Sequence, residues 1–191
     1  MLCRRIWSDY GGIVMDKKEL RRITGYTFAS QQLNKDAWHE SALSFHEAAG
    51  LLWQHRESIH LGLRVALSNA ALSIELLLKA IIVAKGAVAP STHRLLDLAD
   101  DADVAFSESQ KKTLELLTEQ LIWSGRYPVP NREKDWDHYH DCVFDKHVIR
   151  EREGNVGRTL ANPDTFPSIG NYEALWSLAI RKWEEIHSQR A

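Results

Sequence analysis

Residues 61–85 carry the feature that most limits how this chain can fold. Their sequence is LGLRVALSNAALSIELLLKAIIVAK, which is apolar around most of the circumference of a helix. At about 100° per residue, the main polar interruptions, Arg64, Ser68, Glu75 and Lys79, fall within roughly 60° of one another. A helix with one narrow polar line has to be covered by other helices. We therefore expect a buried central helix in an all-α fold.

Composition and charge fit a soluble globular protein of one domain. The chain has 191 residues, of which 44% are hydrophobic and 26% charged, and its formal net charge is −2. This charge gives no bulk signal for nucleic acid, although a local basic face is compatible with it. The charges inside 61–85 argue against a membrane span, because charged side chains in lipid cost several kcal/mol. Two cysteines, Cys3 and Cys142, are too few for a disulfide framework, so we expect a reducing, cytoplasmic setting.

Apolar residues at spacings of three and four predict the helices that cover the central one. Their ranges are 37–57, 94–101, 107–124 and 172–187. Polar residues just before the long helices predict their N-caps, which are Asp36, Ser58, Ser107 and Asn171. Gln110 completes a capping-box pattern with Ser107.

Two segments lack this periodicity. Residues 1–36 are expected to form an irregular lead-in, and residues 1–14 are expected to precede the natural start of the protein. Residues 131–170 are rich in Asp, His, Arg, Gly and Pro, which predicts a long irregular excursion with a short hairpin near 142–149. The predicted fold is a four- to five-helix up-down bundle. Residues 37–191 form its single helical domain, and the polar excursion is a loop insertion before the last helix.

Four short motifs follow one another through the central part of the sequence. They are SIELLLKA at 73–80, KG followed by Pro at 85–90, THRLLDL at 92–98, and GRYP at 125–128. In order and approximate spacing, these pieces resemble the E-x-x-x-K helix, the T-H-x-L turn and the R-Y-P corner of the HEPN family. The resemblance covers roughly residues 37–128, and the last helix fits the position expected for it.

This resemblance implies a four- to five-helix fold, usually a homodimer, and no cofactor. It also implies one of two kinds of function. Many HEPN proteins are metal-independent RNases with an R-x(4–6)-H motif, often acting as toxins or defence effectors. Others serve as nucleotide-linked accessory modules, or as protein partners of small nucleotidyltransferases.

Two pairs fit the spacing of that RNase motif, Arg132…His138 and Arg181…His187. In such a site the histidine exchanges a proton with the 2′-hydroxyl or the leaving oxygen, and the arginine stabilises charge on the phosphate. Arg181 and His187 are separated by about 120° around a regular helix, so they do not converge within one protomer. Lys182 also replaces the small polar residue usual in active members. A solvated arginine and a half-buried histidine are the alternative there, and a chance match in a polar segment is the alternative for the first pair.

A histidine- and aspartate-rich stretch in the excursion offers a second kind of chemistry. If this stretch is extended, His138, His140 and Cys142 point to one side and form a zinc-competent set. Asp145 and His147 are near enough to contribute. The spacing matches no standard structural zinc pattern, however, and solvated loops collect such residues without binding metal.

Arg64, Lys79 and Arg126 are candidates for nucleotide or phosphate binding. The simpler interpretation of Lys79 is an ion pair with Glu75, four residues earlier on the same helix. With Arg64, this polar line could alternatively face a groove or a dimer interface. His93 is expected to hydrogen-bond the backbone where the next helix begins.

We therefore expect a cytoplasmic, self-associating, HEPN-like module with an accessory or binding role in RNA or nucleotide biology, or in a toxin–antitoxin or defence system. The alternatives are a metal-independent endoribonuclease and a metal-binding helical protein. The expected partners are a second copy of the chain, a nucleotidyltransferase-like protein, and RNA or a nucleotide, with no membrane. Four tryptophans on helical stripes are assigned to the core or to a dimer seam: Trp38, Trp53, Trp176 and Trp183.

Overall fold

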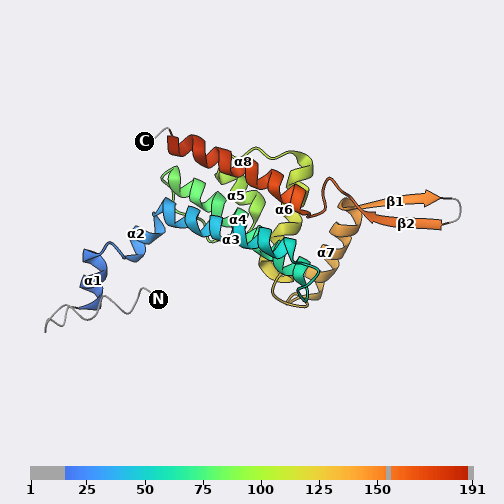
Figure 1. The fold of residues 1–191 in the computed structure, drawn as a ribbon, viewed down its shortest axis with the longest axis horizontal. Coiled ribbons are helices and arrows are strands. Elements are labelled where there is room, and N and C mark those ends of the chain that lie inside the picture. Colours follow the sequence, from blue (N-terminus) through green and yellow to red (C-terminus); the bar gives the residue numbers. More distant parts are fainter. Residues whose placement is uncertain (1–15, 154–155, 189–191) are drawn as a thin grey trace.

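The computed structural model describes residues 16–153 and 156–188, and this part of the chain is mainly helical (Figure 1). Its elements in chain order are α1 (Lys17–Ile23), α2 (Phe28–Gln32), α3 (Lys35–Gln54), α4 (Gly62–Ala84), α5 (Leu95–Asp101), α6 (Glu108–Glu119), the π-helical turn η1 (Gln120–Ser124), α7 (Glu133–Lys146), β1 (Val148–Glu153), β2 (Val156–Ala161) and α8 (Ile169–Ser188). The helical bundle predicted from the sequence is confirmed.

Helix α4 is the buried centre of this bundle, as its apolar circumference predicts. It contacts α3, α5, α6, η1 and α8, and α3, α4 and α8 lie side by side in Figure 1. Ile74, Leu77, Leu78 and Ile81 are fully buried. Among the described residues, α4 is the helix long and apolar enough to cross a membrane, yet 72% of its most apolar window is buried inside the fold. That burial is typical of a core helix.

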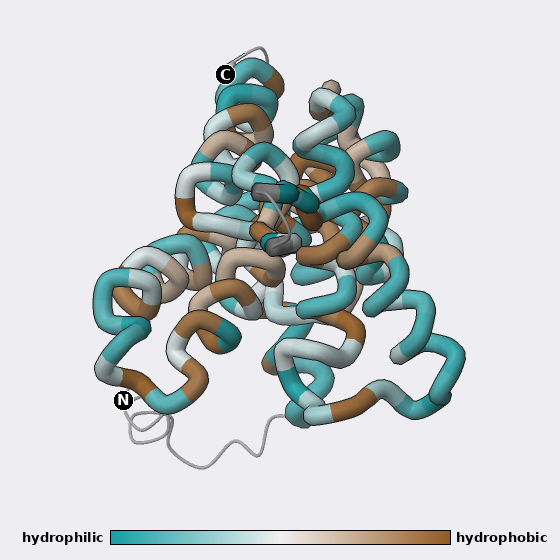
Figure 2. Tube along the Cα trace, turned by 90° about the vertical axis from the view of Figure 1, so that its right-hand side faces the viewer, coloured by the Kyte–Doolittle hydropathy of each residue, from teal (hydrophilic) through white to brown (hydrophobic). Residues whose placement is uncertain are grey.

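Aromatic residues of α3 and α8 complete the core around α4. The rings of two α3 histidines stack on tryptophans of α8 at centroid distances of 4.1 and 4.5 Å. Figure 2 shows apolar segments recurring along the packed helices. All four stripe tryptophans lie in this core or pack against it, as predicted: Trp38, Trp53, Trp176 and Trp183.

Most polar groups in the polar line of α4 find partners within the protomer, and Glu75 Oε2 is the exception among the described atoms of this line. Lys79 donates to Glu75 Oε1 at 2.6 Å, and the two side chains are only 7% and 4% exposed. His93 Nδ1 lies 2.9 Å from the same carboxylate oxygen, so the prediction that His93 bonds the backbone is wrong. Arg64 donates to the carbonyl oxygens of Ser124 and Tyr127, which ties α4 to the end of η1.

The helix starts agree only partly with the predicted caps. Ser107 and Gln110 form the expected capping box. Asn34, not Asp36, caps α3 by accepting from a backbone N–H. Helix α4 follows Leu61, which has a positive φ of 55°, instead of the predicted Ser58. Helix α8 begins at Ile169, three residues before the expected Tyr172. At its start, the Ser168 hydroxyl accepts a hydrogen bond from the backbone N–H of Asn171, the predicted cap residue.

The prediction of an irregular excursion over 131–170 is wrong, because most of this segment forms regular elements. Its first part is the helix α7, and its second part is the antiparallel hairpin of β1 and β2, with Ile149 opposite Leu160. The hairpin therefore lies later than the predicted 142–149, and it projects away from the helices in Figure 1. Within α7, Trp136, Tyr139 and Val143 recur at helical spacing, but acidic residues and histidines surround them. No residue of α7 is fully buried, which explains why its apolar stripe is weak.

The lead-in also differs from the expectation. Within residues 1–36, the described part contains the short helices α1 and α2 and the start of α3, so it is not irregular throughout. These two helices extend from the beginning of α3 and stand apart from the bundle in Figure 1. Phe28 of α2 is 82% exposed. The expectation about residues 1–14 falls outside the described residues.

Candidate functional site

Helix α7 packs on α6, and two cavities open beside it. We call the first the Arg132 cavity; its volume is about 490 Å³ and its lining residues are Glu119, Ile122, Trp123, Tyr127, Pro130, Asn131, Arg132, Asp135 and His138. We call the second the Cys142 cavity; its volume is about 360 Å³ and its lining includes Arg94, Glu115, Glu119, His138, Tyr139, Cys142 and Lys146. His138 borders both cavities.

Arg132 and His138, one of the two predicted catalytic pairs, lie on the same cavity. Arg132 immediately precedes α7, and its guanidinium donates from Nε and Nη2 to the carboxylate of Asp135 at 2.7 and 2.9 Å. This bidentate hydrogen bond holds the pKa of Asp135 below its ordinary value. His138 follows three residues after Asp135 and is exposed. Asp135 was not among the predicted site residues, because the helix that brings it between Arg132 and His138 was not predicted.

Two aromatic residues, Trp123 and Tyr127, are among the residues that line the Arg132 cavity. Trp123 is buried, and its indole N–H donates to Glu119 Oε2 at 2.6 Å. Tyr139 of α7 meets the Trp123 ring edge-on, at 5.3 Å between centroids. Tyr127 is 53% exposed, and the Arg126 guanidinium lies 5.6 Å from its ring centroid. A planar group entering this cavity would therefore meet Trp123 and Tyr127 together with the Arg132 guanidinium.

The second predicted catalytic pair is not brought together in this way. Arg181 and His187 are both exposed on α8, and neither lines the cavities beside α7. The His187 ring stacks on Trp183, and its Nδ1 lies 3.0 Å from Lys35 Nζ. The structure therefore places His187 against the start of α3 and not against a second catalytic group.

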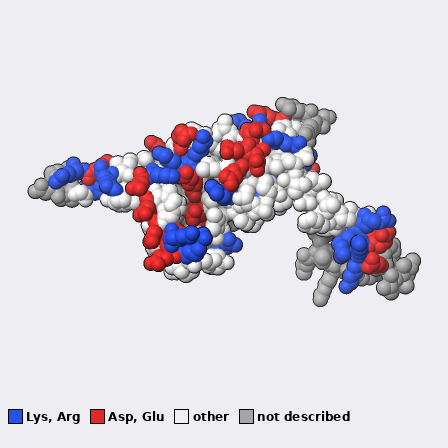
Figure 3. Space-filling view, turned by 180° about the vertical axis from the view of Figure 1, so that it is seen from behind, with Lys and Arg blue, Asp and Glu red and all other residues white. Residues whose placement is uncertain are grey.

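The three candidates for phosphate binding make contacts within the fold. Arg126 donates to the carbonyl oxygens of Leu121 and Ile122 at 2.7 and 3.1 Å, which satisfies acceptors at the end of η1. Arg64 donates in the same way to the carbonyl oxygens of Ser124 and Tyr127. Lys79 is buried in its ion pair with Glu75. These arrangements favour a structural role for all three. On the face shown in Figure 3, basic and acidic side chains are interspersed, without a continuous basic surface.

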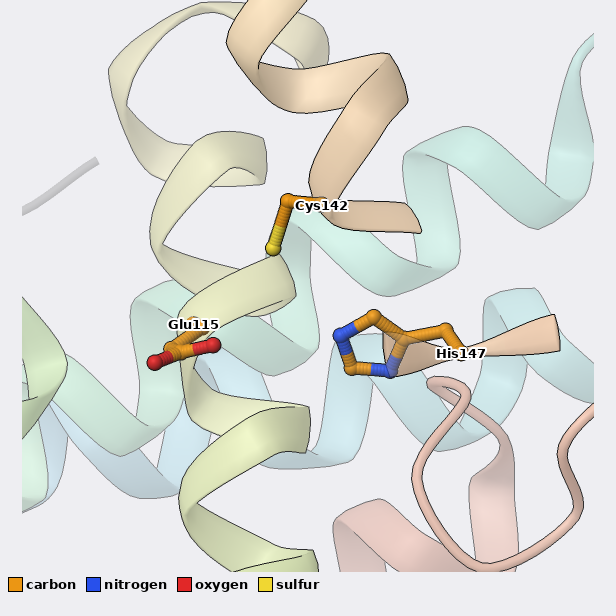
Figure 4. Close-up of side chains that lie close together, drawn as sticks. All are labelled: Glu115, Cys142 and His147. Carbon is orange, nitrogen blue, oxygen red and sulfur yellow. The ribbon is translucent and has the colours of Figure 1, made fainter. Parts of the chain in front are cut away.

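The predicted metal ligands are not arranged as expected, because their segment is a helix and not an extended strand. His138 and Cys142 lie one helical turn apart and both line the Cys142 cavity. His140 instead contacts the ring of Trp136, at 4.4 Å between centroids. A different set of possible ligands lies close together here, and Figure 4 shows it: Glu115, Cys142 and His147. Cys142 belongs to the predicted set and His147 is one of the two residues expected to contribute to it, whereas Glu115 was not predicted.

Comparison with known proteins identifies the family of this bundle. No curated protein and no solved structure matches the chain. The family model of the HEPN domain matches residues 35–154, a range that begins with α3 and runs past α7 into the hairpin. It includes the E-x-x-x-K helix, the R-Y-P corner and the Arg132 cavity. The chain belongs to the HEPN domain family.

Proposed function

We propose that this HEPN protein is a cytoplasmic, homodimeric accessory module that binds RNA or a nucleotide in the Arg132 cavity, as part of a toxin–antitoxin or defence system. One observation carries the proposal: Arg132 and His138 open on the same cavity, beside aromatic residues. A guanidinium recognises phosphate through paired N–H donors, and a base stacks on an aromatic face. The cavity offers both kinds of contact.

The ion pair between Arg132 and Asp135 leaves the arginine available to a ligand. The two side chains are 64% and 33% exposed, so water screens their attraction. A phosphate presents the same fork of oxygen atoms as a carboxylate and carries at least as much negative charge. When a phosphate displaces the Asp135 carboxylate from Arg132, the paired hydrogen bonds of the guanidinium therefore keep their geometry. Glu119 and Asp135 keep the cavity from being strongly basic, so we expect modest affinity that falls as salt rises.

Exposed apolar residues near the start of α4 support self-association. Leu51, Leu61, Leu63 and Val65 are 60%, 56%, 46% and 37% exposed, and they lie at the end of α3 and the first turn of α4. Exposed apolar side chains at one end of this helical hairpin are available for burial against a second copy of the chain. Size-exclusion chromatography with light scattering should give twice the chain mass of 21.9 kDa. Replacement of Leu63 and Val65 by glutamate should give the single-chain mass, whereas a dimer that persists would refute this interface.

Fluorescence anisotropy with a labelled single-stranded RNA oligonucleotide tests the ligand site. Arg132→Ala should weaken binding by about ten-fold, which corresponds to the loss of one phosphate contact with paired hydrogen bonds. Arg181→Ala is the matched control, because Arg181 is an exposed arginine outside both cavities, and it should bind like the wild type. Equal affinities for the wild type and Arg132→Ala would refute the site.

A metal-independent endoribonuclease at the same cavity is the second candidate, and the shared position of His138 and Arg132 favours it. His138 would take the proton of a 2′-hydroxyl, whose oxygen then bonds to the adjacent phosphorus as the bond to the 5′-oxygen breaks, and the proton passes to that leaving oxygen directly from His138 or through water. Arg132 would stabilise the negative charge that develops on the phosphate. Cleavage should then persist in EDTA and disappear in His138→Ala. His140→Ala, two residues away on another face of α7, should retain it. Loss of activity in EDTA, or full activity in His138→Ala, would refute this mechanism.

A further inference from the structure

Three side chains with metal-binding atoms converge where α6, α7 and β1 meet. Glu115 comes from α6, Cys142 from α7, and His147 from the residue between α7 and β1. One oxygen of Glu115, the sulfur of Cys142 and one ring nitrogen of His147 all lie within 4.8 Å of one another. In Figure 4 the three side chains extend from separate elements toward a common space.

His147 gives an independent sign that this space receives a ligand. The residue is completely buried. Its Nδ1 lies 3.2 Å from the carbonyl oxygen of Thr165 and 3.1 Å from the Thr165 hydroxyl. Donation from Nδ1–H to that carbonyl leaves a lone pair on Nε2. Within the described part of the chain, this buried Nε2 has no hydrogen-bond partner.

Buried polar nitrogens are rarely left unpaired, and each exception requires an explanation. A histidine that ligates a metal commonly shows this pattern, in which one ring N–H donates to a carbonyl and thereby directs the other nitrogen to the ion. In this protein Thr165 supplies the carbonyl oxygen that accepts from Nδ1–H of His147. The tautomer that satisfies Thr165 is therefore also the one that makes Nε2 a ligand.

We propose that Glu115, Cys142 and His147 form a zinc-binding site with one open coordination position. A thiolate, an imidazole and a carboxylate are the ligand types that zinc takes, and their mixture disfavours the hard cations magnesium and calcium. Ligand atoms around tetrahedral zinc are separated by about 3.3–3.8 Å, as its bond lengths require. Atoms within 4.8 Å of one another therefore have to approach by at most about 1.5 Å. Glu115 and Cys142 are only partly buried, which leaves their side chains room to rotate toward the ion.

The surroundings supply the fourth position and accommodate the charge. Glu115 and Cys142 both line the Cys142 cavity, from which water or a small ligand can reach the ion. Lys146 donates to Glu115 Oε2 at 2.8 Å and is partly exposed. Its ammonium group can therefore either retain this hydrogen bond or move into solvent when the ion binds. Burial raises the pKa of the Cys142 thiol, and zinc displaces that proton when it binds the thiolate.

Zinc at this point would fasten α7 to the bundle. None of the residues within α7 is fully buried, so this helix is held less firmly than the core helices. The ion would join it to α6 and fix its C-terminal end, while Arg132 and His138 lie nearer its N-terminal end. The site does not depend on RNA binding, so failure of either proposal leaves the other standing.

Metal analysis of the full chain tests the proposal. Protein stripped with EDTA and titrated with zinc chloride should bind one zinc per chain in isothermal titration calorimetry. Cys142→Ser and Glu115→Gln should each weaken this binding by at least ten-fold. His140→Ala is the matched control, because it removes an exposed histidine from the same helix, and it should bind like the wild type.

Cobalt gives a readout that does not depend on stability. Cobalt(II) bound in the zinc site should produce a thiolate-to-metal charge-transfer band, which Cys142→Ser should abolish while its circular dichroism stays native. His147→Ala is not used, because removing this buried side chain disturbs the fold as well as the proposed site. Absence of stoichiometric zinc, absence of the charge-transfer band, or unchanged affinity in both Cys142→Ser and Glu115→Gln would overturn the proposal.

Discussion

The ion pair of Glu75 and Lys79 inside α4 allows a quantitative test of the core. Both side chains are almost fully buried, and their charged atoms are 2.6 Å apart. Lys79→Met keeps the length of the side chain and removes its charge, which leaves the Glu75 carboxylate with the His93 ring as its remaining partner. Glu75 Oε2 is buried and has no hydrogen-bond partner in the described structure. Breaking a buried pair by removing one partner costs about 3–5 kcal/mol. We expect a value near 3 kcal/mol, because His93 still contacts the carboxylate.

Urea unfolding followed by tryptophan fluorescence measures this loss. Replacing both members of the pair, in Glu75→Leu/Lys79→Met, should restore the free energy of unfolding to within about 1 kcal/mol of the wild type, because no buried charge remains. Lys111→Met is the matched control, since Lys111 forms an ion pair at 2.8 Å on the surface of α6. It should unfold like the wild type. If Lys79→Met loses less than about 1 kcal/mol, the buried pair does not hold the core as described.

Three further changes test other parts of the fold. Gly125→Ala should destabilise the protein by about 1–3 kcal/mol in urea unfolding, because its Cβ would overlap the Ser68 hydroxyl; wild-type stability would contradict this packing. Tyr172→Phe should lower the free energy of unfolding by about 1–2 kcal/mol, since it removes a buried hydroxyl that lies 2.8 Å from Ser73 Oγ; no loss would mean that this contact is not made in solution. Burial lowers the pKa of His147, so the unfolded chain takes up this proton at a higher pH than the folded protein does. Stability in EDTA should therefore fall as the pH drops through about 6.5 toward the lowered folded-state value, and it should fall less in His147→Asn; an equal decline in both proteins would exclude this contribution.

The bundle follows from the sequence where a helix buries an apolar face. Residues 61–85 predict a covered helix because one narrow polar line interrupts an apolar circumference. The capping box of Ser107 and Gln110 marks the start of α6 by local chemistry alone. Helix α7 was missed because its acidic residues and histidines outnumber the stripe of Trp136, Tyr139 and Val143. A helix that covers a surface without burying a face gives only a weak periodic signal.

The candidate sites show the same limit. The spacing of Arg132 and His138 could be read from the sequence, but their common cavity depends on α7 packing beside η1. The hydrogen bond of His93 to Glu75 joins residues that are eighteen positions apart. Glu115, far from Cys142 in sequence, could not be grouped with it before α6 and α7 were known to be adjacent. These sites depend on contacts between helices and turns that are distant in sequence, and local sequence patterns do not predict such contacts.

The ligand site beside α7 is the central claim, and hydrogen–deuterium exchange tests it most directly. Exchange should be compared with and without a saturating single-stranded RNA oligonucleotide. Our account predicts slower exchange of backbone amides in residues 119–146, which contain η1 and α7, and unchanged exchange at the C-terminal end of α8. Protection confined to residues 181–188, or no protection anywhere in 119–146, would contradict it.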